Sequence, residues 1–226
     1  MIQERLVSIN NQLVQYYKEK LVERRDGPVY LLLHKLGLSD LTIRDYQLGY
    51  APDDLSGFIS FAEKNGISVE ELLEAGQLKK EDQLKLLFSD RIMIPILDAN
   101  DDPVGFCGRR IDKNESPVYL CKVPEDSRLI GLHIAKETKK DYLILCDGLI
   151  DPMLFYEKGY VNAVGYYNFG EKQAETIGKY AKRVIVVPDH DSYGKNLGSK
   201  VCKLLHAVGV QADCKEDYLI TNAEES

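Results

Sequence analysis

The chain has 226 residues, of which 44% are hydrophobic, and a formal net charge of −7. This length and composition predict one or two compact globular domains rather than a low-complexity chain. The acidic balance argues against indiscriminate adhesion to nucleic acid, so any nucleic-acid surface must be a local cluster of lysines and arginines.

Neither export nor membrane insertion is indicated. No run of about 18 apolar residues occurs, and residues 1–25 are charged and amphipathic, unlike a signal peptide. We therefore expect an intracellular, cytoplasmic protein without membrane contact. The scattered cysteines include no CxxC pair and the histidines are few, which predicts reduced thiols and neither a zinc module nor a disulfide framework. The cysteines are Cys107, Cys121, Cys146, Cys202 and Cys214.

The first half of the chain predicts helices. Apolar residues recur at helical spacing from residue 3 to 25, and Gly27 followed by Pro28 ends that helix. A second helix is predicted over residues 29–36. Ser39 and Ser68 then stand where N-caps are expected, ahead of helices that reach residues 46 and 75.

The hydrophobic period changes between residues 91 and 120. Residues 91–97 and 104–111 are rich in strand-forming side chains and are joined by a turn-rich segment, which predicts a β-hairpin. Residues 117–120 predict a third strand.

From residue 141 onward, short β-rich runs alternate with helical ones. Strands are predicted at residues 142–146, 161–164 and 184–187, and helices at 152–157, 171–180 and 195–207. This alternation predicts right-handed βαβ crossovers and a mostly parallel sheet, in which ligands lie outside the carboxyl ends of the strands.

Four aspartates fall at those strand ends. Asp147 follows the first of these strands and Asp151 lies four residues later, while Asp189 and Asp191 follow the third strand. Carboxylate oxygens are the ligands that Mg²⁺ prefers, together with water and substrate phosphate. The pattern predicts a divalent-metal site that handles nucleic-acid phosphates.

Other readings of these acids stay open. Aspartates at strand ends commonly cap helices or make turns, and Asp151 is a candidate N-cap. A phospho-acceptor receiver domain also gathers aspartates there, but it needs an acidic pair after its first strand. We expect His190 to be a spacer rather than a ligand, because a nitrogen ligand suits zinc or iron better.

Several segments, in order, resemble the catalytic core of bacterial and phage DnaG-type primases, which joins a basic N-terminal subdomain to a TOPRIM domain. They are residues 48–52 (LGYAP), 90–96 (DRIMIPI), 104–109 (VGFCGR), 117–120 (PVYL), 130–132 (IGL), 147–151 (DGLID) with 159–164, and 189–195 (DHDSYGK). Asp147 stands where TOPRIM proteins normally carry Glu, a side chain longer by one methylene.

The resemblance implies an α/β fold. An α+β subdomain over residues 1–139, with helices and a small antiparallel sheet, would precede a TOPRIM domain over residues 140–220. That domain would have a mostly parallel βαβ sheet with helices on both faces. Residues 221–226 would form an acidic tail. The zinc-binding and C-terminal helical parts of full-length primases are not expected in this sequence.

The resemblance also implies synthesis of short RNA primers on a single-stranded DNA template. The partners would be that template, ribonucleoside triphosphates and a replicative helicase, in a bacterial cell or a phage-infected host. Asp147, Asp189 and Asp191 would be catalytic, and with Asp151 they would hold Mg²⁺ or Mn²⁺, with no zinc. Basic residues would contact template or nucleotide phosphates, where arginine suits bidentate contacts. These are Arg91, Arg109, Arg110, Lys122, Arg128 and Lys195.

Two alternatives accompany this expectation. A primase-derived module that binds DNA or a helicase without polymerising is favoured by the shorter acid at Asp147. A TOPRIM nuclease ranks last, because it needs its own base or nucleophile and no tyrosine, such as Tyr166 or Tyr193, is singled out by its context.

Overall fold

The structure is a computed structural model that describes residues 3–98, 100–112, 117–189 and 191–215. The predicted acidic tail and His190 lie outside these residues. The chain forms two compact units, one of Met1–Ile96 with Asp102–Pro124 and the other of Leu97–Asp101 with Glu125–Ser226. In the sequence, the last boundary between these units falls between residues 124 and 125. The sequence predicts a domain boundary after residue 139, and that boundary stays a prediction.

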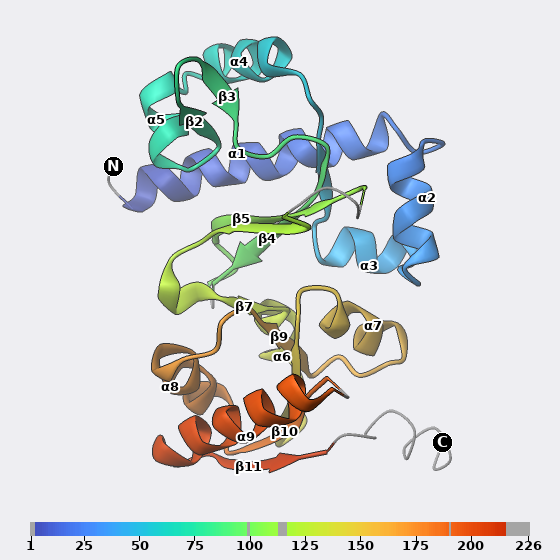
Figure 1. Cartoon of the computed structure of the whole chain (residues 1–226), viewed down its shortest axis with the longest axis vertical. Helices are drawn as coiled ribbons and strands as arrows, with labels where there is room; N and C mark the ends of the chain where they lie inside the picture. Colours follow the sequence, from blue (N-terminus) through green and yellow to red (C-terminus); the bar gives the residue numbers. More distant parts are fainter. Residues whose placement is uncertain (1–2, 99, 113–116, 190, 216–226) are drawn as a thin grey trace. The chain divides into compact units, whose positions relative to one another are not determined.

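The first unit is organised around the helix α1 (Gln3–Val22), which carries a stripe of buried residues and packs against two strands (Figure 1). One of these is β1 (Gly49–Ala51), whose first residue must be small. A Cβ on Gly49 would lie 2.5 Å from the Cβ of Tyr17, so only glycine allows this strand to approach the helix so closely.

A four-stranded sheet completes the core of this unit, in the order β1-β4-β5-β6. Strands β4 (Arg91–Leu97) and β5 (Pro103–Arg110) are neighbours, as the predicted hairpin requires, and β6 (Tyr119–Lys122) is the predicted third strand. Cys107 and Cys121 lie opposite each other in β5 and β6 and form a disulfide. The expectation of reduced thiols is therefore wrong for this pair, because the strand register, which sequence spacing does not show, brings the two sulfurs together.

The remaining elements of this unit are short. Helices α2 (Pro28–Lys35), α3 (Asp40–Asp45) and α5 (Val69–Glu74) lie where helices were predicted. Ser39 caps α3, and Ser68 forms a full capping box with Glu71. Four elements were not predicted from the sequence: α4 (Leu55–Lys64), β1, and the hairpin of β2 (Leu78–Lys80) and β3 (Leu84–Leu86).

The second unit contains a five-stranded sheet in the order β11-β10-β8-β9-β7. Strands β8 (Tyr142–Asp147), β9 (Ala163–Tyr166), β10 (Arg183–Val187) and β11 (Gln211–Cys214) are parallel, and the short β7 (Leu129–Ile130) is antiparallel to β9. The mostly parallel βαβ sheet is confirmed. Strands β7 and β11 were not predicted.

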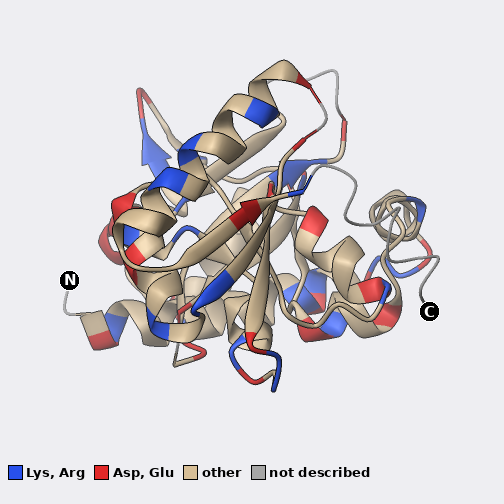
Figure 2. Cartoon of the chain, turned by 90° about the horizontal axis from the view of Figure 1, so that it is seen from below, with Lys and Arg blue, Asp and Glu red and all other residues tan. Residues whose placement is uncertain are grey.

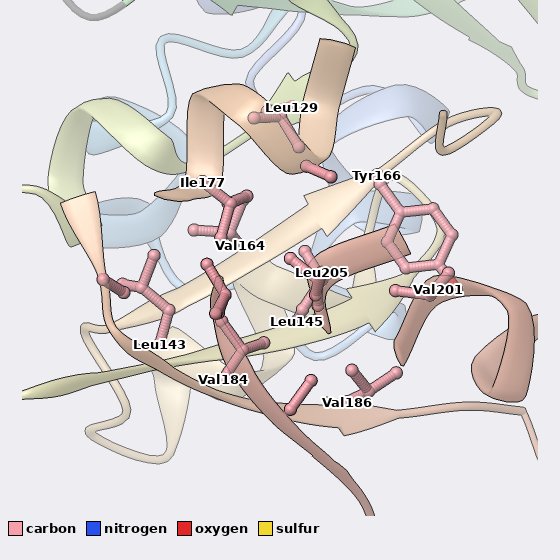
Figure 3. Packing of buried hydrophobic residues seen from close by; sticks show 14 of the residues in the cluster. Leu129, Leu143, Leu145, Val164, Tyr166, Ile177, Val184, Val186, Val201 and Leu205 are labelled. Atoms are coloured by element: carbon pink, nitrogen blue, oxygen red, sulfur yellow. The ribbon is translucent and has the colours of Figure 1, made fainter. Parts of the chain in front are cut away.

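Helices cover both faces of this sheet, as predicted. Alternate residues of β8 enter two different apolar clusters, because successive side chains of a strand point to opposite faces. One face packs against α6 (Leu132–Ala135), α8 (Glu171–Tyr180) and α9 (Ser192–Ala207), and the other packs against α7 (Asp151–Glu157). Figure 3 shows the first of these clusters, with Leu143, Leu145, Val164, Ile177 and Leu205 among its members.

A short 3-10 helix, η1 (Glu125–Ser127), precedes this sheet and packs against α8, where the side chain of Gln173 donates a hydrogen bond to the backbone carbonyl of Glu125. Of the helices in the described part of the chain, none combines the length and apolar character needed to cross a membrane.

Candidate functional site

The sheet of the second unit brings two acid-bearing strand ends side by side. Strands β8 and β10 are parallel neighbours, and the last pair in their register joins Cys146 to Val187. Asp147 therefore ends one strand beside the segment in which Asp189 follows the other. The prediction that acids meet at neighbouring strand ends is correct for these two positions.

Asp147 lies on the α8 and α9 face, since it follows the alternation of Leu143 and Leu145. Its carboxyl group is half-buried. Burial is the largest cause that raises its pKa, and the negative charge of Asp189 is the second. The direction of this pKa shift means that the site disfavours the carboxylate unless positive charge is added.

Tyr166 is the register partner of Asp147 across β8 and β9, so the two side chains share a face. The ring is 1% exposed, packs edge-on against Phe169 and is labelled in Figure 3. Burial, and next the charge of Asp147, raises the pKa of its phenol. Tyr166 thus forms one wall beside Asp147, a position that only the strand register reveals.

Asp151 is the first residue of α7 and not its N-cap, a position that Ile150 occupies. The prediction of an N-cap is therefore wrong, because the helix begins one residue earlier than a capping role for Asp151 would require. Burial raises the pKa of Asp151 to about 6, with further contributions from the charges of Asp189 and then Asp147. This carboxyl group is electrostatically part of the same cluster.

Gly148 makes room for that carboxyl group. Its φ of +101° lies in the region that favours glycine, and a Cβ there would lie 2.6 Å from Oδ2 of Asp151. The glycine is required both by its backbone conformation and by the approach of the acid.

Asp189 and Asp191 are exposed at the entry to α9. Asp191 is the N-cap of this helix, and its side chain accepts a hydrogen bond of 2.7 Å from the backbone N–H of Gly194. A Cβ on Gly194 would lie 2.5 Å from the carbonyl oxygen of Asp189, so this glycine lets the helix start against the strand end. Capping, one of the alternatives for such acids, is thus a role that Asp191 fills.

The acids influence one another but do not form a closed metal cage. Within the described ranges, no three His, Cys, Asp or Glu side chains are arranged to hold a metal ion. The donor set nevertheless suits a hard divalent cation, because it consists of carboxylates whose pKa values are raised first by burial and then by their mutual repulsion.

The structure buries two of the predicted phosphate-binding arginines. The guanidinium of Arg91 donates hydrogen bonds to the carbonyl oxygens of Gly108, Pro117 and Val118 at 2.9–3.1 Å. Arg109 is 2% exposed and lies against the ring of Tyr119. Both side chains support the sheet of the first unit, and phosphate contact by either stays a prediction.

The other predicted basic residues are more accessible. In the first unit, Arg110 is half-buried and Lys122 is exposed, with its alkyl stem over Gly76. In the second unit, Arg128 is half-buried and Lys195 is exposed in the first turn of α9. Figure 2 shows the basic residues of α9 as blue bands along that helix. Phosphate binding by these four residues stays a prediction.

Comparisons with known proteins point to one family. Residues 16–126 match the family model of the DNA primase catalytic core, N-terminal domain. The DNA primase of Legionella pneumophila is 31% identical over 203 residues, and that of Aquifex aeolicus is 29% identical over 214 residues. These alignments cover 84% and 89% of this chain but only 34% and 42% of the relatives, so the chain spans well under half of their length.

Solved structures show the same fold. The Aquifex aeolicus primase, solved with its zinc-binding and RNA polymerase domains, is 26% identical with a TM-score of 0.84, over 95% of this chain and 55% of that one. A DnaG primase catalytic domain bound to single-stranded DNA is 23% identical with a TM-score of 0.82, over 93% of this chain and 70% of that one.

Proposed function

We propose that this chain, which belongs to the DnaG-type DNA primase family, synthesises short RNA primers on single-stranded DNA by metal-dependent nucleotidyl transfer. The observation that carries the proposal is the placement of Asp147 and Asp189 at the adjacent ends of β8 and β10, with Asp151 at the start of α7, where the charges of both raise its pKa beyond the effect of burial. The proposed substrates are ribonucleoside triphosphates. Since the template is DNA, the proposed compartment is the cytoplasm of a bacterial or phage-infected cell.

In this proposal, Asp147, Asp151, Asp189 and Asp191 hold Mg²⁺ or Mn²⁺. The ion would neutralise nucleotide phosphates and help to align the reacting oxygens. The protein's part is to gather carboxylates at one strand edge and to fix them there, Asp191 through its cap and Asp151 through the space beside Gly148. Arg110, Lys122, Arg128 and Lys195 are the proposed phosphate contacts that remain accessible. A replicative helicase is a proposed partner.

The alternative is a binding module that engages DNA or a helicase without polymerising. Two observations favour it: the shorter acid at Asp147, and the commitment of Asp191 to capping α9. A misplacement of about 1 Å in a reacting group is enough to cost on the order of 100-fold in rate.

A primer-synthesis assay separates these functions. Single-stranded DNA, ribonucleotides and Mg²⁺ or Mn²⁺ are incubated with the chain, and oligoribonucleotides are separated by length. We expect Asp189→Asn and Asp191→Asn to reduce synthesis by on the order of 100-fold, while Mn²⁺ affinity falls in parallel. Asparagine also caps helices, so Asp191→Asn removes the charge and leaves α9 intact.

The matched control is Asp54→Asn, because Asp54 caps α4 in the same manner, with a hydrogen bond of 2.9 Å from Gly57. This variant should synthesise primers at the unaltered rate. If the unmodified chain binds DNA but makes no oligoribonucleotide with either metal, the binding module replaces the polymerase.

A further inference from the structure

One face of α9 lies along the edge strand β11. Gly198, Cys202 and His206 are spaced four residues apart and so share one side of the helix. At the end of this row, Nε2 of His206 lies 3.0 Å from the carbonyl oxygen and 3.2 Å from the backbone nitrogen of Ala212. These contacts fix the row of α9 against the strand.

The same register brings a second cysteine to the helix. Cys214 lies two residues after Ala212, and therefore on the same side of β11. A Cβ on Gly198 would lie 3.0 Å from Sγ of Cys214, so the sulfur occupies the space that the glycine leaves on the helix, one turn from Cys202. The neighbouring thiol of Cys214 is, after burial, among the causes that raise the pKa of Cys202.

The two thiols differ in access. Cys214 is exposed on the last strand of the sheet, whereas Cys202 is half-buried, and burial raises the pKa of its thiol to about 11. Cys146, the other cysteine outside a disulfide, is buried on the opposite face. A reagent from solvent therefore meets Cys214 first, and Cys202 is the thiol within reach of the product.

We propose that Cys202 and Cys214 form a dithiol modification site, which a low-molecular-weight disulfide such as oxidised glutathione closes into a cross-link between α9 and β11. The thiolate of Cys214 attacks one glutathione sulfur, which forms a mixed disulfide and releases one glutathione thiolate. Cys202 then loses its proton to solvent and attacks Sγ of Cys214, which releases the second glutathione. Two protein thiols are oxidised and one glutathione disulfide is reduced to two thiols.

The test is peptide mapping of the whole chain. The protein is reduced, freed of reductant, exposed to oxidised glutathione, alkylated and digested without reduction. We expect a linked pair of peptides that contains Cys202 and Cys214, and the loss of both as alkylation sites. Closure of Cys107 and Cys121 in the same digest shows that the oxidant reached the protein.

Single variants check the order of the steps. Cys202→Ser should accumulate a lasting glutathione adduct on Cys214, and Cys214→Ser should leave Cys202 unmodified. The proposal is overturned if the unmodified chain keeps the adduct on Cys214, if two chains join through Cys214, or if both thiols survive while Cys107 and Cys121 close.

Discussion

Gly148 combines a left-handed backbone with a close acid, and the two effects can be measured separately. Gly148→Ala places a Cβ at a φ of +101° and 2.6 Å from Oδ2 of Asp151, whereas Gly159→Ala has a φ of +84° and no atom within 4 Å. The backbone penalty, about 1–2 kcal/mol, is common to both. We therefore expect Gly148→Ala to lower the free energy of unfolding by more than Gly159→Ala in urea denaturation. Equal losses would mean that the side chain of Asp151 moves away from the added methyl group without a measurable loss of stability.

Asp151 predicts an unusual dependence of stability on pH. Its folded pKa of about 6 lies above the ordinary value of 3.8, so the folded chain binds an extra proton between those pH values. The metal-free protein should therefore lose stability as pH rises from about 4 to 6, through this group. Asp151→Asn should flatten that part of a stability–pH curve and make the chain more stable at pH 8.

A matching titration with Mn²⁺ follows from the same carboxyl group. Protons compete with the ion at Asp151, so Mn²⁺ affinity should fall as pH drops through about 6. The pH step should disappear in Asp151→Asn. A step of unchanged size in that variant would place the titrating group elsewhere.

Sequence patterns predicted the acids but not their surroundings. Asp147 and Asp189 were predicted at neighbouring strand ends because βαβ alternation makes their strands parallel. Tyr166 was not identified, because its position beside Asp147 depends on the register between β8 and β9. Asp191 caps its helix and Asp151 does not, because α9 begins one residue after its aspartate whereas α7 begins at its aspartate.

At the scale of elements, the side chain of Arg91 holds together three segments of the first unit. It joins β4 to the backbone of Gly108 in β5 and to the segment before β6 through carbonyl oxygens. Arg91→Leu would leave buried acceptors unpaired, which costs about 1–3 kcal/mol for such a group. We expect a loss of about 3 kcal/mol in denaturant unfolding.

Arg44→Leu is the matched control for Arg91. The side chain of Arg44 is 70% exposed and pairs with Asp45 at the surface. Its replacement should change stability by less than about 0.5 kcal/mol. Similar losses in both variants would show that the carbonyl contacts of Arg91 contribute little.

Long periodic elements were predictable and short ones were not. Helix α8 has the predicted bounds, and α9 begins three residues before the predicted start. Strands β1, β2, β3, β7 and β11 contain two to four residues each, too few for a period to emerge. Strands β1, β7 and β11 form by pairing with longer strands, and β2 and β3 pair with each other, so all five depend on contacts beyond their own sequence.

For the whole molecule, the order of short motifs was more informative than composition. The net charge of −7 gives no direct indication of a nucleic-acid protein, and the basic residues gather locally, as along α9. The predicted family is confirmed by the match of residues 16–126 and by the relatives, and the fold by a TM-score of 0.84. The chain has this fold with Asp147 in place of the glutamate expected there, so the consequence of the shorter acid is a question for activity measurements.

The hairpin formed by β4 and β5 contains residues of both units. Apart from Leu97, the last residue of β4, its strands belong to the first unit, whereas residues 97–101 belong to the second, where Asp101 pairs with Lys136 at 2.8 Å. The side chain of Lys136 is only 12% exposed, and Leu97 and Asp98 line a cavity with Leu129. In evolutionary terms, the second unit cannot be inherited as one continuous gene segment. Recombination after residue 124 would separate Lys136 from its ion-pair partner Asp101.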